Sequence, residues 1–107
     1  MRALKERADA LEAYYVHEQE NAFKARARGA KVFGLWAAGQ MGLKEEASAR
    51  YAAGLACVGA LSRNADPVFD RVRQDFHASG LPFSETWLKR QLDSTVDAAL
   101  QEVEREG

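Results

Sequence analysis

Residues 23–42 read FKARARGAKVFGLWAAGQMG and narrow the architectures that the chain can adopt. One side of this segment carries its larger apolar groups at helical spacing, namely Phe33, Trp36, Ala37 and Met41. A second row repeats every four residues with almost no side-chain bulk: Ala30, Gly34, Ala38 and Gly42. Neighbours can approach such a helix closely on more than one face, which is typical of the central member of a small helical bundle.

The flanking segments also have helical periodicity. Residues 1–21 carry a narrow apolar stripe among charges of both signs: Leu4, Ala8, Leu11 and Tyr15. Residues 44–62 carry the row Tyr51, Leu55 and Val58. Residues 66–78 carry Phe69, Val72 and Phe76, and the last segment carries Leu88, Leu92, Val96, Ala99 and Val103. We therefore predict a helix in each segment.

Residues with known helix-end preferences stand between these segments. Gly42 is a candidate C-cap, and Gly80 followed by Pro82 predicts a second helix end. Asp66, which precedes a proline, and Ser84 are predicted N-caps. No segment alternates with period two, so we predict an all-α fold: a four-helix bundle over residues 22–107 and an N-terminal helical arm over residues 1–21.

The arm carries too narrow an apolar stripe to be stable by itself, because most helix stability comes from packing. We expect it to be partly mobile when free and to become ordered against a partner. The alternative, that it simply packs on the bundle, stays open. Gly29 lies where a hinge between arm and bundle would be useful, and the sequence does not decide whether it is one.

Composition excludes several classes of function. The chain has 107 residues, of which 47% are hydrophobic and 29% charged, and a net charge of −1, so no global field recruits nucleic acid or an anionic membrane. No segment approaches the run of about 20 apolar residues that crosses a bilayer. The N-terminal residues lack the layout of a signal peptide, and a single cysteine fits a reducing compartment. We expect a cytoplasmic protein in which Cys57 is a small buried hydrophobe.

Catalytic chemistry is not indicated. His17 and His77 lie in different segments, each without a second histidine or cysteine at metal-ligand spacing. A glycine-rich phosphate loop after a strand is absent as well. We predict that the protein is not an enzyme and holds no metal. Trp36 and Trp87 are interpreted as core anchors. The best candidates for anion contact are the cluster Lys24, Arg26, Arg28 and Lys31, which spreads over several helix faces.

The central segment resembles the zeta subunit of bacterial ATP synthases, a family of small proteins that inhibit ATP hydrolysis by the rotary enzyme. The resemblance covers nearly the whole chain, and its most specific block is Gly34-Leu35-Trp36-Ala37-Ala38. The matched residues that we single out as core and family motif are Phe23, Lys24, Gly34, Leu35, Trp36, Met41, Gly42 and Phe76. Further matches are His17-Glu18, Lys31, Val72-Arg73, Asp75 and Ala78-Ser79-Gly80.

The resemblance implies an inhibitor whose arm becomes helical as it enters a catalytic α/β interface of the ATP synthase head, while the bundle stays outside. The implied partners are the alpha, beta and gamma subunits, and the implied location is peripheral to the membrane through the synthase. The free protein would be a monomer. The family's arm corresponds to residues 1 to about 17 here, and the predicted partner-binding side chains are Leu4, Arg7, Leu11, Glu12, Tyr14 and Tyr15.

Two features differ from the family pattern: the basic opening Arg2-Ala3-Leu4-Lys5-Glu6, and the pairs Gly29-Ala30 and Gly39-Gln40. The basic opening lies in the arm, so it is the difference that concerns inhibitory potency. Two alternative functions stay open, a helical module that binds the synthase without inhibiting it and a bundle that senses adenine nucleotide. No cofactor is expected beyond weak adenine-nucleotide binding, which the resemblance also implies without placing its residues.

Overall fold

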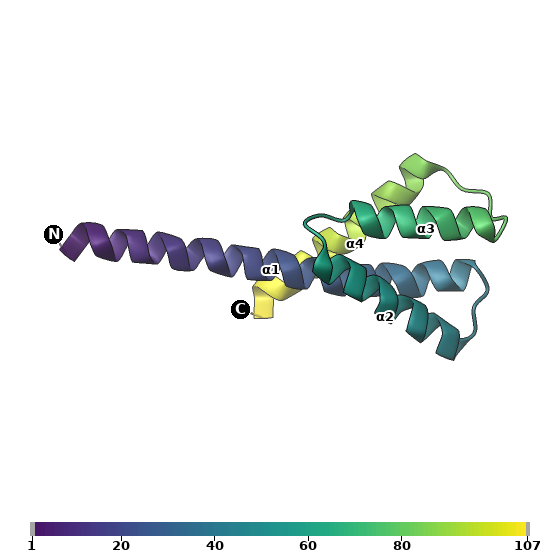
Figure 1. Cartoon of the computed structure of the whole chain (residues 1–107), viewed down its shortest axis with the longest axis horizontal. Helices are drawn as coiled ribbons and strands as arrows, with labels where there is room; N and C mark the ends of the chain where they lie inside the picture. Colours follow the sequence, from purple (N-terminus) through teal and green to yellow (C-terminus); the bar gives the residue numbers. More distant parts are fainter. Residues whose placement is uncertain (1, 107) are drawn as a thin grey trace.

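The predicted helical segments form four α-helices in the part of the chain that the computed structural model describes, which is the backbone of residues 2–106 and the side chains of residues 7–106 (Figure 1). Their bounds are α1 Arg2–Gln40, α2 Glu45–Leu61, α3 Asp66–Ala78 and α4 Glu85–Glu106. Helices α2, α3 and α4 gather around the C-terminal half of α1, and the N-terminal half of α1 extends beyond them. The all-α, four-helix fold is confirmed.

The arm and the central helix of the bundle are one element. Helix α1 has 39 residues and is uninterrupted at Gly29, and at a rise of about 1.5 Å per residue it is about 58 Å long. It gives the molecule an extent of 64 Å along its longest axis. A continuous helix is what this sequence favours, because neither glycine nor proline occurs before Gly29.

The core lies between the C-terminal half of α1 and the other three helices. Its buried side chains include Ala30, Phe33, Ala37, Leu55, Val68, Val72, Phe76, Leu88 and Leu92. Most of them belong to the predicted rows, but Val68 belongs to none, and Phe69 of the predicted row in α3 is only partly buried. Tyr51, Val58 and Val96 are partly buried against this cluster. Burial of these rows supplies the main stabilisation, since a side chain of this size contributes about 1.5–3 kcal/mol when removed from water.

Small residues allow α1 and its neighbours to cross at short distance. A Cβ atom built on Gly34 would lie 2.9 Å from the Cα of Ala52 in α2. At Gly59 of α2, such an atom would lie 2.8 Å from the carbonyl oxygen of Arg26. Gly34 and Ala30 of the row of small residues on α1 therefore face α2.

Trp36 occupies the centre of an aromatic cluster at the end of the core. Its ring centroid lies 5.4 Å from those of Phe33 and Trp87 and 6.0 Å from that of Phe76. Phe83, from the segment before α4, contacts Phe76 edge-to-face at 5.5 Å. Trp87 remains 44% exposed, so it covers this cluster from outside and the prediction of a core anchor fits Trp36 better.

Glycines end the first and third helices as predicted. Gly42 has φ +74°, the N–H of Gly42 donates to the carbonyl of Gly39, and the N–H of Leu43 donates to the carbonyl of Ala38. This pair of bonds is the Schellman motif, which satisfies carbonyl groups left free at a helix end. Gly80, with φ +71°, ends α3 in the same way.

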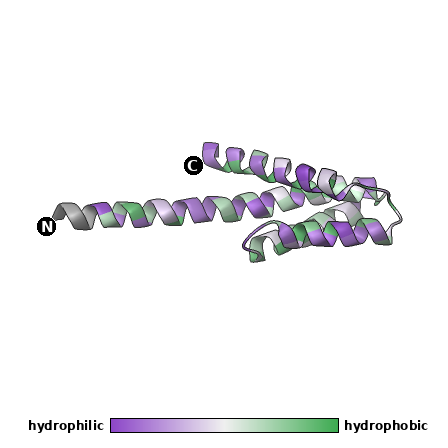
Figure 2. Cartoon of the chain, turned by 90° about the horizontal axis from the view of Figure 1, so that it is seen from above, coloured by the Kyte–Doolittle hydropathy of each residue, from purple (hydrophilic) through white to green (hydrophobic). Residues whose placement is uncertain are grey.

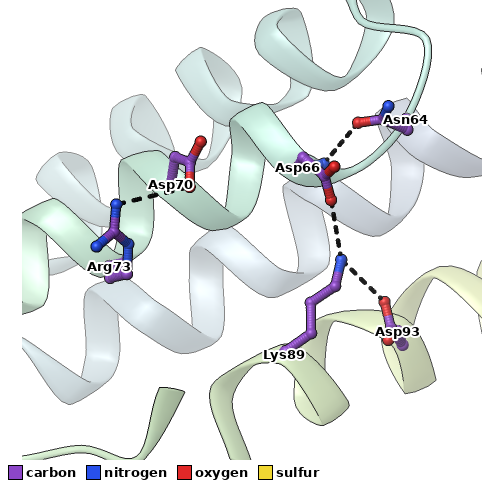
Figure 3. Close-up of polar contacts among 6 residues, drawn as sticks. All are labelled: Asn64, Asp66, Asp70, Arg73, Lys89 and Asp93. Atoms are coloured by element: carbon purple, nitrogen blue, oxygen red, sulfur yellow. Dashed lines mark hydrogen bonds and ion pairs between the residues drawn. The ribbon is translucent and has the colours of Figure 1, made fainter. Parts of the chain in front are cut away.

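The N-terminus of α3 differs from the prediction by one residue. Asp66 is the first helical residue, Ala65 precedes it with helical φ and ψ, and no side chain caps the helix. Asn64 turns the chain instead, because its Oδ1 accepts a hydrogen bond of 2.9 Å from the Asp66 N–H. The Asp66 carboxylate is thereby left to pair with Lys89 of α4 at 3.3 Å, and Lys89 also pairs with Asp93 (Figure 3).

The N-terminus of α4 follows the prediction. The Ser84 Oγ accepts a hydrogen bond of 3.3 Å from the N–H of Trp87, three residues on. From there α4 runs back along α1, so that the C-terminus lies beside the middle of that helix (Figure 2). Helix α4 thus braces α1 where the arm leaves the bundle.

Candidate protein-binding surface

The arm is solvent-exposed along its whole described length. Every residue from 7 to 20 is exposed, and the first buried one is Asn21. The arm nevertheless carries large apolar side chains: Leu11 is 68% exposed, Tyr14 and Tyr15 are each 62% exposed, and Val16 is 52% exposed. Large exposed apolar side chains make the arm a candidate binding surface.

Helical geometry divides these residues between two faces. Arg7, Leu11, Tyr14 and Tyr15 lie three to four residues apart and share one side of α1, which we call the tyrosine face. The opposite side carries Asp9, Glu12, Ala13, Val16, His17 and Glu20, which line a shallow hollow. The tyrosine face is amphipathic, whereas the opposite face is acidic. Glu12, predicted as a polar contact, lines the hollow on the acidic side and lies three residues before Tyr15.

Hydrogen bonds along the helix orient both tyrosines. The Tyr14 hydroxyl donates to Oε1 of Glu18 at 2.7 Å, and Nε2 of Gln19 donates to the Tyr15 hydroxyl at 2.8 Å. The hydrogen bond to Glu18 and its negative charge raise the pKa of Tyr14 above the ordinary value for tyrosine. Each hydroxyl is thus held by a side chain one turn further along α1, and both tyrosines stay exposed.

The end of α4 holds α1 just beyond the arm. Arg28 donates from both terminal nitrogens to Glu106, at 2.6 and 3.0 Å, and its Nη1 lies 3.9 Å from Glu102. The hydrogen bond from Arg28 lowers the pKa of Glu106, and Glu106 in turn raises the pKa of Arg28. The acidic end of α4 is exposed yet paired with Arg28 of α1.

A comparison with protein families bears on what this arm binds. The model of the family ATPase inhibitor subunit zeta matches residues 1–102. This chain belongs to that family. The matched range includes the whole arm and nearly all of the bundle, and the family's name indicates an inhibitor subunit of ATP synthase, a regulatory role in association with that enzyme. Neither curated proteins nor solved structures gave a significant match.

The zeta-family motif divides between core and surface. Gly34 and Phe76 are buried, and Trp36 and Met41 pack against the core. Gly42 ends α1 at the surface. Phe23, Lys24 and Leu35 are exposed, with Phe23 at 46% and Leu35 at 44%, so an assignment of these three to the core is wrong. The sequence pattern did not distinguish these residues from the buried ones, because it does not show which sides of α1 the other helices leave uncovered.

The zeta-family arm contains one predicted contact that lies outside the described side chains, Leu4. The structure brings Arg7, Leu11, Tyr14 and Tyr15 together on the tyrosine face. Sequence reasoning missed Glu18 and Gln19 as the groups that orient the tyrosines, although the four-residue spacing from Tyr14 and Tyr15 is a signal for such pairs.

The basic cluster of the zeta-family chain does not form one site. Arg28 is paired with α4, and Lys24 and Lys31 are exposed. Arg26 is partly buried, and its Nε is shielded from solvent without a hydrogen-bond partner in the described chain. A hollow beside Arg26 is lined by Gln19, Ala22, Arg26 and Arg63. The spacing in sequence could not join Arg26 to Arg63, which follows α2.

Other chemical groups of the zeta-family chain lie apart from the arm. Cys57 is exposed on α2, so the prediction of a buried cysteine is wrong: its side of α2 faces away from the other helices. Within residues 7–106, no group of three or more histidine, cysteine or carboxylate side chains could hold a metal ion. None of the helices in the described part of the chain has the length and apolarity to span a membrane.

Proposed function

We propose that this zeta-family protein inhibits ATP hydrolysis by inserting its arm, residues 1–21, into a catalytic α/β interface of the ATP synthase head. The observation that carries the proposal is the projecting arm of α1, whose tyrosine face is covered by nothing in the described chain. The partners are the alpha, beta and gamma subunits, and the free protein is a monomer with no cofactor.

The geometry of the arm supports a wedge. A single helix is about 10–12 Å across and can enter a cleft between subunits. Leu11, Tyr14 and Tyr15 supply large side chains for hot-spot contacts, since buried aromatic residues dominate most interfaces. The helix-in-groove mode uses apolar anchors at the same three- to four-residue spacing.

The free energy gained by burying the arm at the interface must offset the free-energy cost of holding it helical. Outside the bundle it makes few tertiary contacts, so its helix is only marginally stable in water. Full burial of each large apolar side chain contributes about 1.5–3 kcal/mol. Several such side chains on one face therefore suffice to order the arm in a preformed cleft.

The test is ATP hydrolysis by the organism's own purified ATP synthase head, titrated with this protein. The full chain is expected to inhibit, and a chain lacking residues 1–20 is expected to leave hydrolysis unchanged. Leu11→Asp should abolish inhibition, because it places a charge in the middle of the tyrosine face. Leu61→Asp is the matched control, since Leu61 is an exposed leucine of the bundle at 89% exposure.

Binding to the head without any change in hydrolysis would contradict the proposal and identify a non-inhibitory module. Equal loss of inhibition in Leu11→Asp and Leu61→Asp would also contradict it, because the contact would then not be specific to the arm. Thermal unfolding of both variants should match that of the parent chain, since neither leucine belongs to the core.

A further inference from the structure

Two arginines share a hollow at the base of the arm. Gln19, Ala22, Arg26 and Arg63 line an open hollow of about 660 Å³ between α1 and the segment after α2. The lining contains two guanidinium groups and an amide, and no carboxylate. Within residues 7–106, neither Arg26 nor Arg63 forms an ion pair, although Arg28, Arg71 and Arg73 all do.

Arg26 has a buried donor without an acceptor. Its Nε is shielded from solvent and forms no hydrogen bond. Helix α2 covers the base of this residue, because it crosses α1 at Gly59, where a Cβ atom would lie 2.8 Å from the Arg26 carbonyl oxygen. A buried N–H of a charged group without an acceptor is unusual and costly in a native protein. Arg26 therefore lines the hollow without an acceptor for this group among residues 7–106.

The hollow is continuous with the tyrosine face. Gln19 lines the hollow and also donates a hydrogen bond of 2.8 Å to the Tyr15 hydroxyl. Leu11, Tyr15, Gln19 and Arg26 fall on the same side of α1, at intervals of four, four and seven residues. Arg26 is about 16 Å beyond Tyr15 along the helix. A protein that covers the tyrosine face therefore meets the two arginines next.

We propose that Arg26 and Arg63 form a pocket for a carboxylate side chain of the protein that accepts the arm, so that the docking surface extends from the arm onto the bundle. The inference rests on the proposed function. A guanidinium group matches a carboxylate in geometry and forms charge-assisted hydrogen bonds with it. Arg63 follows the C-terminal end of α2, where the helix dipole favours cations, so the two arginines can stay adjacent before the carboxylate arrives.

The experiment measures the Kd of the full chain for the purified ATP synthase head at several salt concentrations. The double variant R26Q/R63Q is expected to bind about tenfold more weakly, with a shallower salt dependence, because a charge-assisted contact is lost. Arg50→Gln is the matched control, since Arg50 is an exposed arginine on another side of α2 and also forms no ion pair within residues 7–106. Its Kd should equal that of the parent chain.

Folding of the variants is checked by thermal unfolding. Because Arg26 is partly buried, Arg63→Glu provides a second variant on an exposed residue, and it should weaken binding by at least as much as the double variant. Unchanged affinity in a folded Arg63→Glu variant would overturn the pocket. The same holds for a folded R26Q/R63Q variant whose Kd equals that of Arg50→Gln.

Three further outcomes separate this inference from the proposed function and from a small-anion site. If Leu11→Asp abolishes binding while R26Q/R63Q does not affect it, the arm is the docking element and the pocket is overturned. If the parent chain does not bind the head, both proposals fail. Inorganic phosphate serves as a small-anion probe, followed by the NMR signal of the Arg26 Nε–H. If phosphate saturates this signal and the chain still binds the head with the same Kd, the carboxylate pocket is also overturned.

Discussion

Gly34 of α1 lies so close to Ala52 of α2 that a Cβ atom on Gly34 would be 2.9 Å from the Ala52 Cα and 2.9 Å from Cδ1 of Leu55. The first of these contacts is with backbone, which cannot move aside as a flexible side chain can. The separation of α1 and α2 is therefore set by the absence of a side chain at position 34.

Gly34→Ala is accordingly expected to destabilise the protein, although alanine favours helix. Overpacking costs about 1–3 kcal/mol, which exceeds the gain of about 1 kcal/mol in helix propensity. Gly54→Ala is the matched control, because nothing lies within 4 Å of its Cβ position on α2, and it should stabilise the protein by up to about 1 kcal/mol. Denaturant unfolding measures both, and a Gly34→Ala variant as stable as the parent would contradict the argument.

Tyr51 joins α2 to α3 through Asp75. Its hydroxyl donates a hydrogen bond of 2.7 Å to Oδ2 of Asp75, which also accepts from Nε of Arg71 at 3.2 Å. Tyr51→Phe should lower the free energy of unfolding by about 1 kcal/mol, the usual contribution of such a bond. Tyr15→Phe provides the control, since Tyr15 is exposed on the arm and packs on no other helix. Equal stability of the two variants would exclude a role for the Tyr51 hydroxyl.

The same tyrosine predicts a pH dependence. Burial and the hydrogen bond to Asp75 raise the pKa of Tyr51 well above the ordinary value for tyrosine. The folded state therefore holds this proton more tightly than the unfolded state, so the stabilisation is complete below about pH 10 and is lost as the pH rises further. Denaturant unfolding at pH 8 and pH 11 should show a smaller loss of stability in Tyr51→Phe than in the parent.

Arg28 and Glu106 predict a change at acidic pH. Because Arg28 lowers the pKa of Glu106, the carboxylate form is favoured in the folded state, and the stabilisation is present above the ordinary glutamate pKa and lost as the pH falls through the lowered value. In Arg28→Gln, the pKa of Glu106 measured by NMR should rise to the ordinary value for glutamate. High salt should weaken the pair in the parent, because both groups are on the surface. An identical pKa in both proteins would show that the pair does not form.

The arm should act only as a helix. Ala13→Pro places proline within the exposed part of α1, where it costs about 3 kcal/mol. Inhibition should therefore weaken by roughly a hundredfold, because each factor of ten corresponds to about 1.4 kcal/mol. Ala13→Ser serves as the control and should inhibit nearly as well as the parent. Full inhibition by the proline variant would mean that the arm binds in another conformation.

Much of this fold could be predicted from the sequence because its helices follow strong local rules. The row from Leu88 to Val103 repeats every three to four residues, and Gly42 and Gly80 provide the left-handed conformation that ends a helix. These signals depend on neighbours in sequence. They are therefore visible without knowledge of how the helices pack.

What the sequence could not show depends on which helix faces remain uncovered. Cys57 and Leu35 each lie in an apolar segment, and burial was the natural expectation, yet three helices around α1 leave one side of α1 and one side of α2 open to solvent. Gly29 was considered as a hinge. It is instead a crossing point with α4, where a Cβ atom would lie 3.0 Å from the Cα of Val96.

The candidate site shows the same division. The apolar stripe of the arm, including Leu11 and Tyr15, was recognisable from its spacing. The hollow that joins Arg26 to Arg63 was not, because 37 positions separate these residues in sequence and only the crossing of α2 over α1 brings them together.

Because α1 is continuous through Gly29, the arm and the bundle share one unbroken helix. In helical form, the part of α1 before Asn21 is about 30 Å long. The helix has no break at which the bundle could bend away and let a longer part of α1 enter a cleft. The depth to which the arm can enter a cleft is then limited by the start of the bundle at Asn21. A force on the N-terminal end of the arm is transmitted along α1 to the end of α4, where Glu106 pairs with Arg28.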